Sequence, residues 1–303
     1  AEISINGTFK GECPLDMQVR EGTVKLRVQK KLDAQHERVF EQEFRVGDGV
    51  VKKIEVKLGA PQLNAEGRRL DERLVLGVRN AAEGGDSKAM MDLANRYSKG
   101  EGVPYSPEQS AQWLSKAAAA GDIKAMLTLG KENSYSSNVS RQQESIRWFR
   151  RAAEAGSAEG MVGLGVCYAL GTGVEKNYAE AVQWYRKAEE LGNGLAMYYI
   201  AENYNRGLSV EKNDAQAVAW LRKSAQAGHT DAMYELGLAY YRGLNGLAQD
   251  KQQAFTWFLA AAEKGHANGM YTVGTFYSGG GTVQQDEQKA VAWFRKAAEE
   301  KQG

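Results

Sequence analysis

The segments AVQWYRKAEELG (181–192), AVAWLRKSAQAG (217–228) and AVAWFRKAA (290–298) place a tryptophan in nearly the same setting three times. Six tryptophans occur in the chain, at intervals of 35, 36, 36, 37 and 36 residues. A fixed period between about 20 and 50 residues is typical of stacked repeats, in which each unit buries its apolar face against its neighbours. We therefore predict one elongated array where a length of about 300 residues would otherwise suggest two globular domains. The repeated residues are Trp113, Trp148, Trp184, Trp220, Trp257 and Trp293.

Each unit contains two helical patterns joined by short turns. The first, as in AMYELGLAY (232–240), repeats apolar or small residues at spacings of three and four, and the second carries the tryptophan. Residues that favour helix N-caps stand seven positions before the tryptophan, as at Asn177 and Asp250, or eight before it at Ser140 in the shorter second unit. Five of the six units end in a glycine that can close a helix. The predicted helix hairpins span 86–121, 122–156, 157–192, 193–228, 229–265 and 266–301.

Small residues recur on helix faces that must approach each other. A glycine inside a helix costs about 1 kcal/mol relative to alanine, so its recurrence indicates that a neighbouring backbone comes too close for a side chain. We expect the six tryptophans to form the repeat core, each indole filling the gap between adjacent hairpins. Burying one ring of roughly 200 Å² would contribute up to ~5 kcal/mol at ~25 cal/mol/Å². The small residues after the leucine-type position are Ala94, Gly130, Gly165, Ala201, Gly237 and Gly274.

The unit A-M-x-x-L-G-x-x-Y, then G-x-G-V, then A-V-x-W-[YFL]-x-K-A-A-x-x-G resembles the Sel-one-like repeat (SLR), a relative of the tetratricopeptide repeat, over residues 86–301. The resemblance implies a mainly α fold, a right-handed α/α superhelical solenoid of about six helix hairpins. Residues 68–85 resemble only the second helix, with Gly77 at the tryptophan position, and are predicted to form an N-terminal cap. The second unit departs from the pattern at Asn133 and in its SSNV loop.

The first 58 residues follow a different period. EISIN, LDMQVR, TVKLRVQKK, RVFEQEFRV and VKKIEVKLG alternate apolar and polar residues and predict a small antiparallel all-β domain, with His36 in a loop. The elements I-N-G, K-G-x-C-P-L and E-G-x-V-x-L resemble the PEGA domain, a sandwich-like β domain, with Cys13 where threonine is usual. An absent opening strand would leave an edge open for pairing with another segment. Residues 59–67 are predicted to be the linker.

Composition and motifs argue against several classes of function. The chain carries 39 basic and 38 acidic residues, so nothing suggests the phosphate attraction on which nucleic-acid binding depends. No apolar run approaches the ~18 residues of a membrane span, and the two cysteines, Cys13 and Cys167, are expected to be unpaired. His229 and His266 occupy a position that otherwise holds aspartate, serine or asparagine, so we expect either helix capping or solvent exposure for them. Because HExxH, CxxC, GxSxG and Walker patterns are missing, we expect no enzyme, no metal and no cofactor.

The remaining candidate is a surface for a protein or peptide. The resemblance implies an adaptor scaffold, and such proteins are often exported in bacteria, which favours the bacterial periplasm or cell surface and leaves the cytoplasm open. By analogy with tetratricopeptide repeats, the first helices should line a concave face rich in tyrosine and arginine. The tyrosines at one repeat position, Tyr198, Tyr234 and Tyr271, would fit equally well as buried core residues of the repeats. The alternative is an extracytoplasmic or regulatory sensor region of a larger bacterial receptor or kinase. The candidate binding residues are Asn95, Lys131, Tyr198, Glu202, Arg206, Tyr234, Tyr241, Arg242 and Tyr271.

Overall fold

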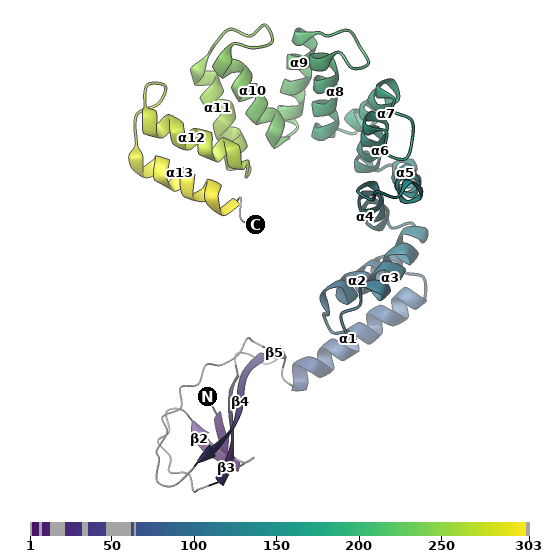
Figure 1. Cartoon of the computed structure of the whole chain (residues 1–303), viewed down its shortest axis with the longest axis vertical. Coiled ribbons are helices and arrows are strands. Elements are labelled where there is room, and N and C mark those ends of the chain that lie inside the picture. Colours follow the sequence, from purple (N-terminus) through teal and green to yellow (C-terminus); the bar gives the residue numbers. More distant parts are fainter. Residues whose placement is uncertain are drawn as a thin grey trace. The chain divides into compact units, whose positions relative to one another are not determined.

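The computed structural model describes the backbone of residues 2–5, 8–12, 22–31, 36–46, 62–63 and 65–300, and the side-chain environments of residues 73–300. The chain divides into two compact units, Ala1–Lys116 and Ala117–Gly303. Strands come first in the chain, and helices follow to its end (Figure 1). Each unit is described by itself.

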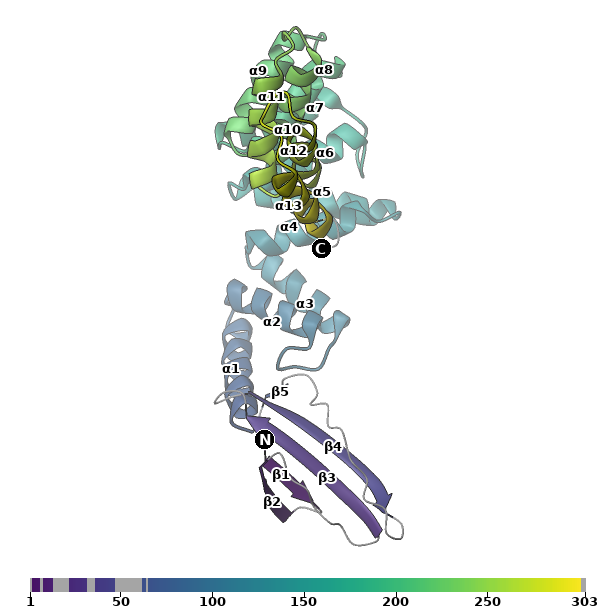
Figure 2. The same ribbon diagram turned by 90° about the vertical axis from the view of Figure 1, so that its left-hand side faces the viewer.

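The strands of the first unit form one antiparallel sheet in the order β2-β1-β3-β4-β5. The two long strands, β3 and β4, pair from Gly22 opposite Val46 to Lys31 opposite Glu37 and lie side by side in Figure 2. His36, predicted to be in a loop, is instead the first residue of β4, where it pairs with Leu63. The strands are β1 (Glu2–Ile5), β2 (Thr8–Glu12), β3 (Gly22–Lys31), β4 (His36–Val46) and β5 (Gln62–Leu63).

Two of the five alternating segments, LDMQVR and VKKIEVKLG, lie outside the described residues, as does Cys13. The resemblance to the PEGA domain, the sandwich-like closure and the open edge therefore stay predictions.

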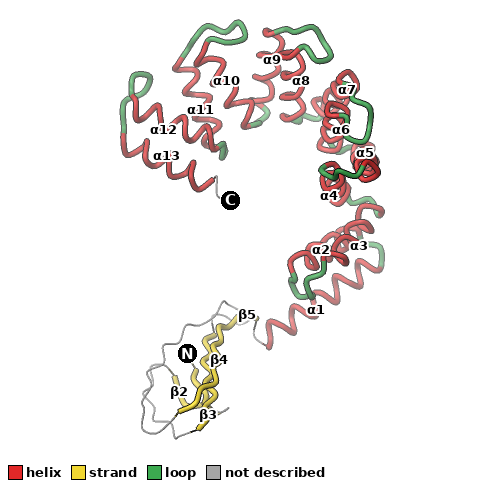
Figure 3. Tube along the Cα trace, in the orientation of Figure 1, coloured by secondary structure: helices red, strands yellow, loops and turns green. Residues whose placement is uncertain are grey.

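Helices joined by loops make up residues 65–300 (Figure 3). The first unit holds α1 (Ala65–Glu83), α2 (Ser87–Lys99) and most of α3 (Pro107–Ala119). Helix α1 begins three residues before the predicted cap, within the predicted linker, because Ala65 and Glu66 are good helix formers. The second unit holds α4 (Ile123–Ser134), α5 (Val139–Glu154), α6 (Ala158–Leu170), α7 (Tyr178–Glu190), α8 (Gly194–Arg206), α9 (Asp214–Gln226), α10 (Thr230–Arg242), α11 (Lys251–Glu263), α12 (Ala267–Gly279) and α13 (Glu287–Glu300).

From α4 to α13 each helix contacts the next, which is the arrangement of an α-solenoid. The α-solenoid of helix hairpins is thus confirmed over α4 to α13, while the exact repeat bounds and the right-handed sense of the superhelix stay predictions. Local capping explains the helix starts: Asn177 accepts the N–H of Glu180, and Asp250 accepts the N–H groups of Gln252 and Gln253. The second repeat is an exception, because Asn138 and not Ser140 caps α5. Asn138 accepts the N–H of Arg141, so the helix starts before Ser140 is reached.

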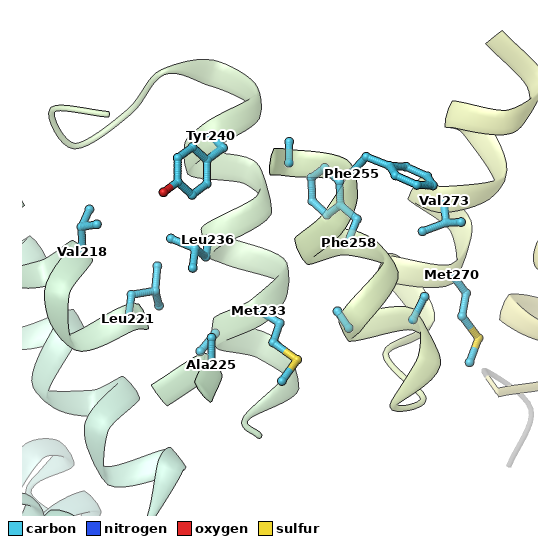
Figure 4. Packing of buried hydrophobic residues seen from close by; sticks show 14 of the residues in the cluster. Val218, Leu221, Ala225, Met233, Leu236, Tyr240, Phe255, Phe258, Met270 and Val273 are labelled. Atoms are coloured by element: carbon cyan, nitrogen blue, oxygen red, sulfur yellow. The ribbon is translucent and has the colours of Figure 1, made fainter. Parts of the chain in front are cut away.

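In α5, α7 and α11 the most deeply buried large side chain is the aromatic residue after the tryptophan. Phe149 is 4% exposed, and Tyr185 and Phe258 are 1% exposed. The indoles, expected at the centre of the core, are half-buried in five repeats, and only that of Trp113 is buried. The two neighbouring residues diverge by about 100° around a helix, so only one of them can point at the first helix of the same hairpin. In Figure 4 Phe258 lies between α10 and α12 with Leu236 and Val273 nearby.

The buried ring explains the mid-helix glycines. A Cβ atom on Gly130 would lie 2.6 Å from Cε1 of Phe149, and one on Gly237 would lie 2.7 Å from Cδ1 of Phe258. Such distances lie under the 3.0 Å that real Cβ atoms respect. The group that excludes a side chain is therefore a ring of the same hairpin, and not a neighbouring backbone as expected from the sequence.

The pairing holds along the whole chain. Where the residue after the tryptophan is aromatic, the first helix carries glycine, and where it is leucine, the first helix carries alanine. The aromatic residues face Gly130, Gly165, Gly237 and Gly274, and the leucines, Leu114 and Leu221, occur with Ala94 and Ala201.

We predict that Gly237→Ala destabilises the protein by about 1–3 kcal/mol through overpacking against Phe258. An uncrowded mid-helix glycine would instead gain about 1 kcal/mol on the same exchange. Adding Phe258→Leu should recover part of the loss, because the double variant recreates the Ala201 and Leu221 pair. Denaturant unfolding of the four proteins measures this coupling, and a Gly237→Ala protein more stable than the parent would contradict it.

Candidate interaction surface

Five of the six indoles lie under a cation from their own helix, and Trp257, with Ala260 three residues later, is the exception. The Nζ atoms of Lys187 and Lys223 lie 3.9 and 4.0 Å from the ring centroids of Trp184 and Trp220. Residues three apart share one helix face, and a cation over an indole contributes roughly 0.5–1 kcal/mol at exposed sites. The same arrangement occurs with Lys116, Arg151 and Lys296. The five tryptophans from Trp148 to Trp293 therefore form a half-buried border of the repeats.

Arginine–tyrosine hydrogen bonds join successive repeats. In each, an arginine Nη2 two residues after the tryptophan position donates to a tyrosine hydroxyl 18 residues later, on the first helix of the next unit. The shortest joins Arg222 to Tyr240, at 2.6 Å. Arg79 of α1 donates in the same way to Tyr97, so α1 takes the place of a second helix here, while the predicted N-terminal cap over residues 68–85 stays a prediction. The remaining pairs are Arg150 with Tyr168 and Arg186 with Tyr204.

Two histidines cap helices and share one carboxylate. His229 Nδ1 accepts the N–H of Ala232, and His266 Nδ1 accepts the N–H of Gly269. These acceptor roles place the proton of each neutral ring on Nε2. His266 Nε2 lies 3.1 Å from Oδ1 of Asp231, and His229 Nε2 lies 3.7 Å from Oδ2 of the same residue. The capping role that the sequence indicated for both histidines is thus confirmed.

Two predicted binding tyrosines lie against these histidines. The ring of Tyr198 is 5.0 Å from that of His229, and the ring of Tyr234 is 4.6 Å from that of His266. The Tyr198 hydroxyl also donates to Oε1 of Glu235 at 2.7 Å. Both tyrosines therefore connect their own repeat to the following one.

Burial shifts the pKa values of Tyr198, Glu235 and His229. Burial raises the pKa of Tyr198, and its hydrogen bond to Glu235 raises that pKa further. Burial also raises the pKa of Glu235, with Glu202 and Asp231 adding to the effect and the Tyr198 hydrogen bond opposing it. The pKa of His229 is lowered by burial, against the pull of Asp231. The neutral forms of these groups are therefore favoured in the folded protein.

The other predicted binding residues divide by exposure. Tyr241 and Tyr271 are 40% and 56% exposed, and Glu202 is half-buried and pairs with Arg206 at 3.9 Å. Asn95 belongs to the first unit, and the others belong to the second. Sequence reasoning missed the arginine–tyrosine pairs, although their spacing of 18 residues is visible in the sequence. The exposed polar residues of the set are Asn95, Lys131, Arg206 and Arg242.

Within residues 73–300 no group of three or more histidine, cysteine, aspartate or glutamate side chains is arranged to hold a metal ion. None of the described helices combines the length and apolar character needed to cross a membrane. Cys167 is free and buried, as predicted, and burial raises the pKa of its thiol.

We predict that the α10 cap makes stability depend on pH. The folded pKa of His229 lies below its ordinary value, so the stabilisation is complete above about pH 6.5 and is lost as pH falls through the folded pKa. Protonation turns the Nδ1 acceptor into a donor and removes a cap worth about 1 kcal/mol. Asn193 shows that asparagine can cap the equivalent helix, so His229→Asn is the matched variant.

The measurement is the thermal midpoint of both proteins between about pH 7.5 and pH 5. The parent should lose more stability than His229→Asn as pH falls. Protonation of Glu235 has the opposite sign, because its folded pKa is raised, but it is common to both proteins. Equal pH profiles would contradict a titrating cap.

Comparison with known proteins agrees with this geometry. The Sel1 repeat model matches residues 87–122, 123–157, 158–193, 194–229, 230–266 and 267–301. The Sel1 repeat protein of Oxalobacter formigenes is 32% identical, with a TM-score of 0.61 over 75% of this chain and 99% of that one. The antigen c5321 of uropathogenic Escherichia coli, described as displaying an SLR fold, is 30% identical, with a TM-score of 0.46 over 74% of this chain and 56% of that one. No curated protein matches the chain. With six matched repeats, the chain belongs to the Sel1 repeat family.

Proposed function

We propose that this protein is a non-catalytic scaffold that binds a protein or peptide segment along the concave face formed by its first helices. Sel1 repeat proteins are generally scaffolds for protein–protein interaction. The observation that carries the proposal for this chain is the exposed pair Tyr241 and Arg242 at the end of α10. Tyrosine and arginine are among the residues that most often dominate binding energy at interfaces.

The surroundings of this pair favour a contact role. The Tyr241 ring meets Phe276 edge-on, with ring centroids 5.9 Å apart, so one side of the ring is held while 40% of the residue stays open. Such a ring loses little side-chain entropy when a partner binds. Arg206 ends α8 as Arg242 ends α10, so two repeats present a cation at the same position.

Tyr198 and Tyr234 take a different part in the proposal. Their rings lie on His229 and His266, and the Tyr198 hydroxyl is engaged by Glu235. Tyr234 also lies 5.4 Å from the buried ring of Phe258. In this proposal, Tyr198 and Tyr234 fix the spacing between repeats, and the exposed residues Tyr241 and Arg242 contact the partner.

We predict that Tyr241→Ala combined with Arg242→Ala weakens partner capture by about tenfold or more, because each hot-spot residue contributes more than about 1 kcal/mol. The thermal midpoint should change little, since both side chains are exposed. Tyr234→Ala, by contrast, should lower the midpoint, because its ring packs between repeats.

The measurement is photo-crosslinking in native lysate with a benzophenone amino acid at position 241, followed by competition with each variant. Leu191→Ala, an exposed apolar residue at the end of the second helix α7, serves as the matched control and should leave capture unchanged. Undiminished capture by the Tyr241 and Arg242 double variant would refute this surface.

A further inference from the structure

The same repeat position, thirteen residues after the N-cap of the first helix, is exposed in four successive repeats of the second unit. In the first two of these repeats it holds Tyr135 and Leu170, which are 89% and 70% exposed. In the next two it holds exposed arginines. We call Tyr135, Leu170, Arg206 and Arg242 the edge row.

The backbone explains why these side chains are exposed. In three of the repeats a glycine in the left-handed region follows the row residue and turns the chain away from the helix. In the second repeat Tyr135 lies on a turn that Gln142 holds, by donating from Nε2 to the carbonyl of Ser136 at 2.9 Å. Each of the four first helices is followed by another hairpin of the same unit. The three glycines are Gly171, Gly207 and Gly243, with φ of 78, 64 and 67°.

The chemistry of the edge row changes along the array from apolar to cationic. Within residues 73–300 no carboxylate pairs with Arg242, and the loop that follows it, 243–249, carries no charged side chain. Arg206 lies 3.9 Å from Glu202, and an exposed pair at this distance contributes little. Both guanidinium groups are therefore open to carboxylates of a partner.

An occupant has to match both halves of the edge row. Nucleic acid carries a negative charge at every phosphate and needs cations along its whole length, which Tyr135 and Leu170 do not supply. A peptide can carry apolar and acidic side chains in sequence. The row therefore favours a polypeptide over a polyanion.

The spacing of the repeats sets the spacing of the partner's residues. Successive first helices are neighbours, as the hydrogen bond from Tyr198 of α8 to Glu235 of α10 shows (Figure 1). Packed helices lie about 8–10 Å apart, and an extended chain advances about 3.3 Å per residue. One repeat thus corresponds to about three residues of an extended partner.

We propose that the edge row binds an extended segment of a partner protein that carries two apolar and then two acidic residues, each at every third position, in either chain direction. This inference rests on the scaffold function proposed above, because Arg206 and Arg242 end helices of the same binding face. No stretch of residues 1–64 has this pattern in either direction, and residues 65–300 are taken up by the helices and their turns. The segment is therefore assigned to another protein.

The test uses the whole protein and labelled peptides of threonine and glutamine, blocked at both ends. One peptide carries phenylalanine, leucine, glutamate and glutamate at successive third positions, and a second carries them in the reverse order. A third has the same composition with these four residues adjacent. Fluorescence anisotropy should show saturable binding of one of the two spaced peptides below about 1 mM, and the third should bind about tenfold more weakly or worse.

Variants of the cationic half test the charge contacts. Arg206→Gln combined with Arg242→Gln should weaken binding of the spaced peptide about tenfold or more and flatten its salt dependence. A spaced peptide with glutamines in place of its glutamates should bind this variant and the parent equally, because the lost contacts are the same ones. Arg147→Gln combined with Lys264→Gln removes the same charge from exposed positions of α5 and the end of α11, and should bind as the parent does.

Tyr135→Ala combined with Leu170→Ala should weaken binding about tenfold and leave the salt dependence unchanged. Three results would overturn the proposal: no saturation by either spaced peptide, equal binding of the peptide with adjacent residues, or undiminished binding by the arginine variant. If lysate capture depends on Tyr241 and Arg242 while neither spaced peptide binds, the scaffold function stands and the edge row alone is refuted. Circular dichroism of each variant checks that the solenoid is retained.

Discussion

A ring set into a gap left by a missing side chain is the contact on which the solenoid depends. In the repeat of α10 and α11, Phe258 fills the space that a Cβ atom on Gly237 would need. The ring ties the two helices of one hairpin together, and it also reaches the next repeat, where Phe276 lies 5.9 Å away. Because a packed core transmits small changes of volume, this one contact fixes both the width of a hairpin and its distance to the next.

Polar contacts then set the register between hairpins. Arginine–tyrosine hydrogen bonds join α1, α5, α7 and α9 to the first helix that follows each, and the tyrosine–histidine contacts join first helices in the later repeats. Most of these groups lie nearer the surface than the rings, and their contacts hold one geometry between repeats. A scaffold needs this combination, since a repeated and rigid spacing lets exposed residues such as Tyr241 and Arg242 meet a partner at low entropic cost.

Local features of the fold could be predicted from the sequence, and features that join two helices could not. The caps at Asn177, Asp250 and His229 depend only on residues within one helical turn. The spacing to the tryptophan was enough to find the first two, and the repeat position that otherwise holds capping residues indicated the third. The choice between Trp257 and Phe258 as the core residue depends on which direction a neighbouring helix occupies, and both are large and aromatic. The glycines that recur in the first helices carried the necessary signal. They occur in the four repeats that have an aromatic residue after the tryptophan, and alanine replaces them in the two repeats where that residue is leucine. The tryptophan itself is present in all six repeats.

The central claim is that a buried ring after the tryptophan needs a glycine opposite it in the first helix. The repeat of α8 and α9, which has leucine and alanine at these two positions, allows the most direct test. Leu221→Phe would introduce a ring opposite Ala201, and Ala201→Gly would make room for it. The measurement is the unfolding midpoint in denaturant of the parent, both single variants and the double variant. The account predicts that the ring alone destabilises the protein and that the added glycine restores stability although it is the poorer helix former. A double variant that is no more stable than the Leu221→Phe single variant would contradict it.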